Sequence, residues 1–124
     1  MLSKKSILIV EDNCFLALDL AFAVEELGCE VVGPVASVAD ALVLLDCNIL
    51  SGAVLDCQLV DRDVTPVVLK LVDRGIPLII HTGTGIPPEL AKLHPNLPVV
   101  MKPLKPAIVI EMLLARMRTC SISG

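Results

Sequence analysis

Residues Ser51-Gly52-Ala53-Val54-Leu55-Asp56 place a carboxylate directly after a short apolar run. Such a run is typical of a buried strand, and no charged residue lies within four positions of Asp56 on either side. A carboxylate at the end of a buried strand is costly to desolvate unless another group compensates its charge. The fold must therefore bring such a group to Asp56 from elsewhere in the chain.

Two other apolar runs end in charged residues that suit Asp56. Glu11 and Asp12 follow Ile7-Leu8-Ile9-Val10, and Lys102 follows Pro98-Val99-Val100-Met101. In open parallel sheets, ligands bind beyond the C-terminal ends of the strands. We therefore expect three carboxylates and one ammonium to meet at one edge of a sheet.

Apolar runs alternate with segments of helical periodicity along the whole chain. This alternation predicts an α/β fold, a doubly wound, five-stranded parallel sheet with helices on both faces, in one domain over residues 1–124. The predicted strands are Ser6–Val10, Glu30–Val32, Gly52–Asp56, Pro77–His81 and Val99–Met101. The predicted helices cover 13–27, 37–46 and 64–74, a short and irregular helix near 88–93, and a last helix that opens at Pro106.

The composition excludes several classes of protein. Of the 124 residues, 55% are hydrophobic and 19% charged, which argues against disorder. The net charge is −4 and no basic cluster occurs, so nucleic acid is not an expected partner. With no Trp or Tyr and two Phe, the chain offers few platforms for stacking bases or flavins. The apolar run before Glu11 is too short for a signal peptide or a membrane span, so we expect a cytoplasmic protein.

The five cysteines do not predict a metal site or a disulfide framework, because their number is odd and no pair has C-x-x-C spacing. We expect reduced thiols, with Cys57 packed at a strand end. His81 is expected to be a buried, hydrogen-bonded core residue, and His94 to lie at the surface.

The charged cluster suggests a specific chemistry. Three carboxylates repel one another, and a hard divalent cation such as Mg²⁺ relieves this repulsion through oxygen ligands. A carboxylate beside the metal can act as a nucleophile and form an acyl phosphate. Thr82, at the end of the fourth predicted strand, and Lys102 would then supply a hydroxyl and an ammonium to the phosphoryl oxygens.

Four segments in this order resemble the receiver (CheY-like) domains of two-component response regulators. They are Ile7-Leu8-Ile9-Val10-Glu11-Asp12-Asn13, Val54-Leu55-Asp56, Thr82, and Met101-Lys102-Pro103. The resemblance implies the strand order 2-1-3-4-5 and a cis Lys102–Pro103 bond. It implies that Asp56 accepts a phosphoryl group from the phosphohistidine of a sensor histidine kinase or a histidine phosphotransfer protein.

The resemblance also implies a cofactor and its ligands. Mg²⁺ would be held by Asp12, Asp56 and the backbone carbonyl of Gln58, with Glu11 acting mostly through water. Thr82 and Lys102 would bind the phosphoryl oxygens. Such a domain is not an enzyme with a separate substrate: it catalyses only its own phosphorylation and dephosphorylation, and takes no small molecule other than a phosphodonor.

Three segments look like one subgroup of this family, the bacterial receivers that occur alone or attached to HWE-type sensor kinases. They are Asp56-Cys57-Gln58-Leu59, Arg74-Gly75-Ile76-Pro77 and Thr82-Gly83-Thr84-Gly85. In this subgroup Asn is usual where the chain has Gln58, and Tyr where it has Thr84.

Other positions depart from the family pattern. The loop Leu59–Asp63 lacks the usual Met-Pro and Gly, and Val99 occupies the position of the switch aromatic. Asp61 to Asp63 are interpreted as a solvated mixed-charge turn, and Lys105 as a solvated side chain. Our hypothesis is that phosphorylation is retained while the output runs through a rearranged loop after the fourth strand.

Two other functions compete with this one. The first is a non-phosphorylated receiver-like interaction module, fixed in one state by these departures. A flavodoxin-like cofactor domain is disfavoured because no Gly-rich loop follows the first strand. Apolar residues in Val43–Leu45 and Val67–Leu69 exceed what one sheet face needs, which suggests a homodimer or another protein partner.

Overall fold

The computed structural model describes residues 4–123, with side chains up to residue 119. The strands are β1 (Ser6–Val10), β2 (Glu30–Val35), β3 (Gly52–Leu55), β4 (Leu78–Thr82) and β5 (Val99–Met101). The helices are α1 (Cys14–Glu26), α2 (Val38–Cys47), α3 (Thr65–Asp73), α4 (Pro88–Leu93) and α5 (Pro106–Ser123).

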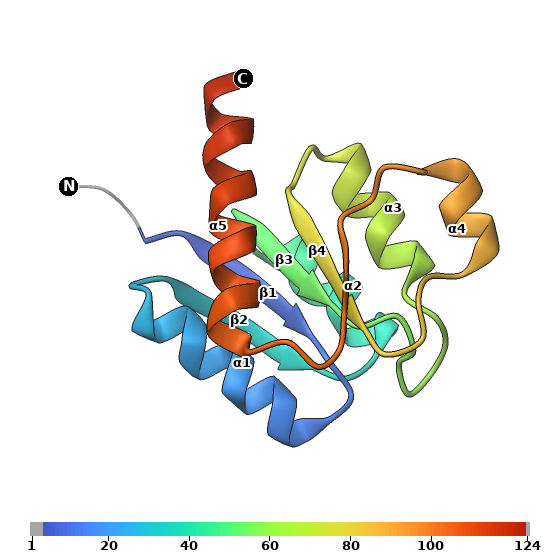
Figure 1. Ribbon diagram of the computed structural model, residues 1–124, viewed down its shortest axis with the longest axis horizontal. Helices are drawn as coiled ribbons and strands as arrows, with labels where there is room; N and C mark the ends of the chain where they lie inside the picture. The colour runs from blue at the N-terminus through green and yellow to red at the C-terminus, as the bar shows by residue number, and fades with distance from the viewer. Residues whose placement is uncertain (1–3, 124) are drawn as a thin grey trace.

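The five strands form one parallel sheet in the order β2-β1-β3-β4-β5, as predicted. Val10 is paired with Leu55, and Thr82 with Met101, so neighbouring strands end at nearly the same level. The residues that follow these strands therefore lie along one edge of the sheet (Figure 1).

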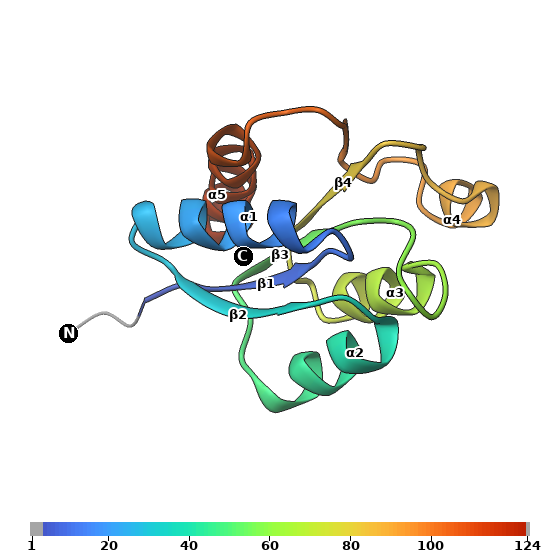
Figure 2. The same ribbon diagram turned by 90° about the horizontal axis from the view of Figure 1, so that it is seen from below.

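Helices cover both faces of the sheet. Figure 2 shows α1 and α5 on one face and α2 and α3 on the other. Because side chains alternate along a strand, β1, β2, β3 and β4 each contribute to two apolar clusters. Leu8, Leu55 and Ile80 face α2 and α3, whereas Ile9 and Val54 face α1 and α5.

Side-chain caps fix where two helices begin. The side chain of Asn13 accepts hydrogen bonds from the backbone N–H groups of Phe15 and Leu16 at the start of α1. The Ser37 hydroxyl accepts one from Asp40 N–H at the start of α2. Gly28, with φ of 79°, follows α1 in the left-handed conformation that glycine adopts readily.

The predicted end of the second strand at Val32, directly before Gly33-Pro34, is wrong. β2 continues through both residues to Val35, with an irregular register between Leu8 and Val10. β2 is an edge strand, where a proline can be tolerated because its missing N–H need not serve a neighbour. By contrast, the short α4 and the cis Lys102–Pro103 bond are confirmed.

The expected exposed apolar surface is also wrong in part. Val67 and Val68 are fully buried, because α3 turns them toward the sheet, although Val43 is 59% exposed. The largest exposed apolar side chains on a single helix are instead those of α1, where Phe15, Leu18 and Phe22 are 78%, 63% and 64% exposed. Among the described residues, none of the helices has the length and apolar character that a membrane crossing requires.

Candidate functional site

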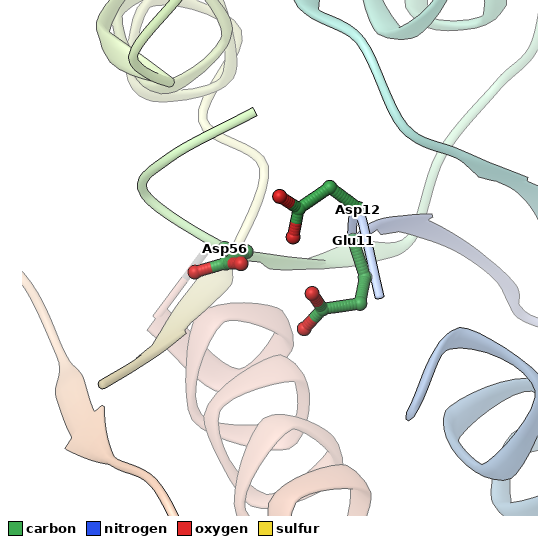
Figure 3. A group of neighbouring side chains, drawn as sticks. All are labelled: Glu11, Asp12 and Asp56. Carbon is green, nitrogen blue, oxygen red and sulfur yellow. The ribbon is translucent and has the colours of Figure 1, made fainter. Parts of the chain in front are cut away.

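The Asp56 carboxylate lies at the C-terminal end of β3, next to the end of β1. Asp56 N–H donates to the Val10 carbonyl at 2.8 Å, which sets it beside Glu11 and Asp12. Figure 3 shows the carboxylates of Glu11, Asp12 and Asp56 converging from the two strand ends. Asp56 is only 8% exposed, and its Oδ1 accepts a hydrogen bond from Cys57 N–H at 2.8 Å.

Lys102 supplies the cation that the sequence requires. Its Nζ lies 3.0 Å from Glu11 Oε1 and 3.3 Å from Asp56 Oδ2. Its backbone N–H donates to the Thr82 carbonyl at 2.8 Å, which continues the β4–β5 pairing beyond Met101. The ammonium thus bridges two buried carboxylates from two different strands.

Burial governs the protonation of this group. The pKa of Glu11 is raised to about 7, chiefly by desolvation and in part by Asp56. Hydrogen bonds from Asn13 N–H and Lys102 act in the opposite direction. Burial lowers the pKa of Lys102, but the hydrogen bonds and charges of Glu11 and Asp56 outweigh this effect and raise it overall. Glu11 is therefore poised to lose or gain a proton near neutral pH while Lys102 stays charged.

The three carboxylates have the chemistry and spacing of a divalent cation site. Glu11, Asp12 and Asp56 each offer a ligand oxygen, and these oxygens all lie within 4.8 Å of one another. Asp12 is exposed, which leaves solvent access to the group. Carboxylate oxygens with access to water are the ligands that Mg²⁺ prefers in proteins. The donor set therefore fits Mg²⁺.

The Gln58 carbonyl lies in the loop between β3 and α3. Gln58 and Asp63 form an isolated antiparallel bridge, flanked by hydrogen bonds from Leu59 N–H to the Arg62 carbonyl and from Val64 N–H to the Cys57 carbonyl. In a bridge flanked in this way, the paired residues point their own C=O groups away from each other. The carbonyl of Gln58 is thus left available as an oxygen ligand.

The structure places Thr82 at the same edge but does not join it to the charged cluster. Thr82 is 1% exposed, at the end of β4. Among the described residues, its hydroxyl accepts a hydrogen bond from Thr84 N–H at 3.2 Å and donates one to the Gly85 carbonyl at 3.4 Å. The hydroxyl is thus held by the loop that follows β4.

Known structures share this fold. SdrG from Sphingomonas melonis Fr1 is 30% identical, with a TM-score of 0.77, over 95% of this chain and 99% of that one. A CheY-like response regulator receiver domain from Methanospirillum hungatei JF-1 is 24% identical, with a TM-score of 0.85, over 98% of this chain and 100% of that one. The chain belongs to the CheY-like receiver domains.

Part of a larger protein is also similar to this receiver domain. The response regulator PhyR from Brucella abortus is 28% identical, with a TM-score of 0.77, over 98% of this chain but 52% of that one. No family model matches the sequence, and no curated protein matches it. Membership of the family therefore rests on solved structures.

The receiver domain departs from sequence expectation at His81. The residue is buried, as expected, but neither ring nitrogen has a hydrogen-bond partner among the described residues, so the expected hydrogen bond is wrong. Its side of the sheet carries the apolar cluster beneath α1 and α5, which offers no acceptor. Burial, and then the nearby Lys102 charge, lower its pKa and favour the neutral imidazole.

Two cysteines of the receiver domain, Cys29 and Cys57, are buried as small apolar side chains are, whereas Cys14 and Cys47 are exposed. Cys57 is fully buried, and desolvation raises the pKa of its thiol to about 11, as suits a packing residue. The other cysteines with described side chains, Cys14, Cys29 and Cys47, are free thiols. Cys120 has its side chain outside the described residues.

Sequence reasoning missed one residue near the site. Asp61 is exposed, as expected of a solvated turn, but its carboxylate accepts hydrogen bonds from Val38 N–H at 2.8 Å and Ala39 N–H at 3.1 Å. Its partners lie 23 and 22 positions earlier, and no local pattern predicts a contact at that separation. Lys105 is exposed, as expected, and Val99 is 37% exposed in β5.

The raised pKa of Glu11 predicts a pH-dependent stability. Between the ordinary carboxyl pKa of 4.5 and about 7, the folded state holds a proton that the unfolded state releases, so stability falls as pH rises. His81 acts in the opposite sense because its pKa is lowered. Between pH 5 and 8, the unfolding free energy of the native chain should fall by roughly 1 to 3 kcal/mol relative to that of the Glu11→Gln variant.

Urea denaturation of both proteins in a chelator, followed by circular dichroism, measures this difference. The Glu11→Gln variant retains His81, so the contribution of His81 cancels in the comparison. Parallel pH profiles for the two proteins would contradict the assignment to Glu11.

Proposed function

We propose that this receiver domain accepts a phosphoryl group on Asp56 from a phosphohistidine of a sensor histidine kinase or a histidine phosphotransfer protein. One observation carries the proposal. The buried Asp56 carboxylate lies 3.3 Å from the Lys102 ammonium and within 4.8 Å of the carboxylates of Glu11 and Asp12. A nucleophile, a cation and a set of metal ligands thus share one strand edge.

The transfer needs little covalent chemistry from the protein. A carboxylate oxygen of Asp56 forms a bond to phosphorus while the P–N bond to the donor imidazole breaks and its electron pair returns to the ring nitrogen. Lys102 neutralises charge on the phosphoryl oxygens. The Thr82 hydroxyl joins it after leaving the Gly85 carbonyl, which it now contacts at 3.4 Å.

Asp12, Asp56 and the Gln58 carbonyl hold Mg²⁺ in this proposal, and Glu11 acts from beside them. When bound, the metal offsets the repulsion between the carboxylates and the incoming phosphoryl oxygens. Lys102 already pairs with Glu11 and Asp56, so it can pass from carboxylate to phosphoryl oxygen without a large displacement.

The proposal covers residues 1–124 as one receiver domain, acting in the cytoplasm and catalysing only its own phosphorylation and dephosphorylation. We also propose that this domain is of the kind that occurs alone or attached to HWE-type sensor kinases. The alternative is a non-phosphorylated interaction module. It draws support from Val99 at the switch position and from a solved PhyR of Bartonella quintana, described as an anti-anti-sigma factor and 24% identical.

Incubation with acetyl phosphate and Mg²⁺ separates the two functions. The native chain should gain the mass of one phosphoryl group, because acetyl phosphate supplies an activated donor without a protein partner. Asp56→Asn should remove the gain, whereas Asp73→Asn, an exposed carboxylate in α3, should retain it. Intact-protein mass spectrometry makes the measurement. No gain in the native chain would favour the interaction module.

We further propose that phosphorylation is reported by the loop between β4 and α4. Thr82 is bonded to Thr84 N–H and the Gly85 carbonyl, so a movement of its hydroxyl toward Asp56 breaks contacts inside this loop. Val99 has no aromatic ring to follow that movement. The loop itself is therefore the element that must change.

Backbone amide shifts across residues 82–97 should change on phosphorylation by more than those across the buried strand β3. Heteronuclear NMR spectra with and without acetyl phosphate give this comparison, with Asp56→Asn as the control. Fixed shifts across 82–97 in a sample whose mass shows full phosphorylation would refute this route of output.

The exposed apolar side chains of α1 are proposed to contact the phosphohistidine donor. The helix begins two residues after Asp12, so Phe15, Leu18 and Phe22 extend outward from the edge that holds Asp56. Both phenylalanines of the chain are thus exposed on one helix. Exposed apolar groups gathered in this way are typical of a protein-binding surface. The homodimer expected from the sequence stays a prediction.

Replacement of Leu18 by Ser should slow phosphoryl transfer from a phosphorylated histidine phosphotransfer protein by about tenfold, because a central contact is lost. Transfer from acetyl phosphate should be unchanged, since that donor needs no docking. Ile49→Ser is the matched control, because Ile49 is apolar and 94% exposed but precedes β3 at the opposite edge of the sheet. Equal slowing by both variants, or slowing with acetyl phosphate, would exclude docking on α1.

A further inference from the structure

The loop between β3 and α3 is a tight hairpin whose tip touches a different part of the fold. Its arms are joined by the two hydrogen bonds that flank the Gln58–Asp63 bridge. Leu59 is buried within the cluster beneath α2 and α3, whereas Val60 at the tip is 71% exposed. The buried Leu59 side chain anchors one arm, but neither it nor the hydrogen bonds between the arms fix the position of the exposed tip.

Asp61 fixes that position. Its Oδ1 accepts a hydrogen bond from Val38 N–H at 2.8 Å, and its Oδ2 accepts one from Ala39 N–H at 3.1 Å. Val38 and Ala39 are the first two residues of α2, whose N–H groups have no partner within the helix. A carboxylate there also interacts favourably with the helix dipole. The hydrogen bonds from these backbone groups keep the pKa of Asp61 below its usual range.

A second contact also attaches the tip of the hairpin to the start of α2. Val60 N–H donates to the Ala36 carbonyl at 3.2 Å, just before α2. Ser37, the residue between Ala36 and α2, already caps the helix by accepting from Asp40 N–H. Asp61 and Ser37 therefore bind different N–H groups, and α2 keeps its own cap without the loop.

The segment that Asp61 contacts is itself joined to the acidic cluster. Glu11 N–H donates to the Val35 carbonyl at 2.9 Å, and Val35 and Ala36 line a pocket with Glu11 and Asp12. The tip of the hairpin and the end of β1 are thus attached to the same short segment, residues 35–39. Through that segment, the loop carrying Gln58 is connected to the strand end carrying Asp12.

We propose that Asp61 is a positioning residue of the phosphoryl-acceptor site. By tying the hairpin to α2, it holds the Gln58 carbonyl beside Asp12 and Asp56, where it can serve as a metal ligand. This inference rests on the proposed function for its metal site but concerns a residue outside it.

Mg²⁺ affinity is the direct test. Loss of a group that orients a metal ligand typically costs 10-fold to 100-fold in affinity, so Asp61→Ala should weaken Mg²⁺ binding by about tenfold. Asp61→Asn, which keeps one acceptor oxygen, should give an intermediate loss. Titration of MgCl₂ into each protein, followed through the amide shifts of Asp56 and Gln58, measures the affinity without any phosphodonor.

Ser37→Ala is the matched control, because it removes a cap of α2 and leaves the hydrogen bonds of Asp61 to α2 intact. It should bind Mg²⁺ as the native chain does, even where its thermal stability matches that of Asp61→Ala. Amide hydrogen exchange at Leu59 and Val64 should quicken in Asp61→Ala and not in Ser37→Ala. At saturating Mg²⁺, the phosphorylation rate of Asp61→Ala should return to near the native value.

The outcomes separate this inference from the proposed function. Native Mg²⁺ affinity in Asp61→Ala, or equal losses in Asp61→Ala and Ser37→Ala, would overturn the role of Asp61 alone. A native chain that binds Mg²⁺ but gains no phosphoryl group would overturn the phosphoacceptor, while a weaker affinity in Asp61→Ala would still uphold the positioning role. A native chain that does not bind Mg²⁺ would overturn both.

Discussion

The ammonium of Lys102 lies between the buried carboxylates of Glu11 and Asp56. The order of the strands in the sheet determines how these three groups meet. β1 and β3 are neighbours, but β5 is separated from β3 by β4. Adjacent strands are about 4.8 Å apart, so the ends of β5 and β3 are about 10 Å apart across β4. The Lys102 side chain extends over much of this distance, and the Asp56 side chain and the 3.3 Å contact between them cover the rest. The two buried carboxylates therefore require a long, positively charged side chain at the end of β5.

The same contact leaves the site with more negative than positive charge. One ammonium faces three carboxylates, two of them buried, and desolvation has already raised the pKa of Glu11 to about 7. The protein retains these charges instead of replacing them with apolar groups, at a cost to its stability. Such a cost is expected where charge is kept for binding or chemistry.

Sequence patterns predicted the parts of this structure that depend on short-range periodicity. The ends of β1, β3 and β5 could be located because an apolar run stops at a charged residue, and their common edge follows from a parallel sheet. The extension of β2 through Pro34 could not be predicted, because it depends on β2 being an edge strand. Burial of Val67 and Val68 depends on how α3 is rotated against the sheet, and the contacts of Asp61 depend on a helix more than twenty residues away.

The short α4 has a consequence for local unfolding. Its six residues include a single buried side chain, Leu90, and no side chain caps its start. Opening such a segment exposes little apolar surface, so it requires much less free energy than unfolding the sheet. The chain between β4 and β5 can therefore exchange between closed and open forms while the charged edge stays assembled.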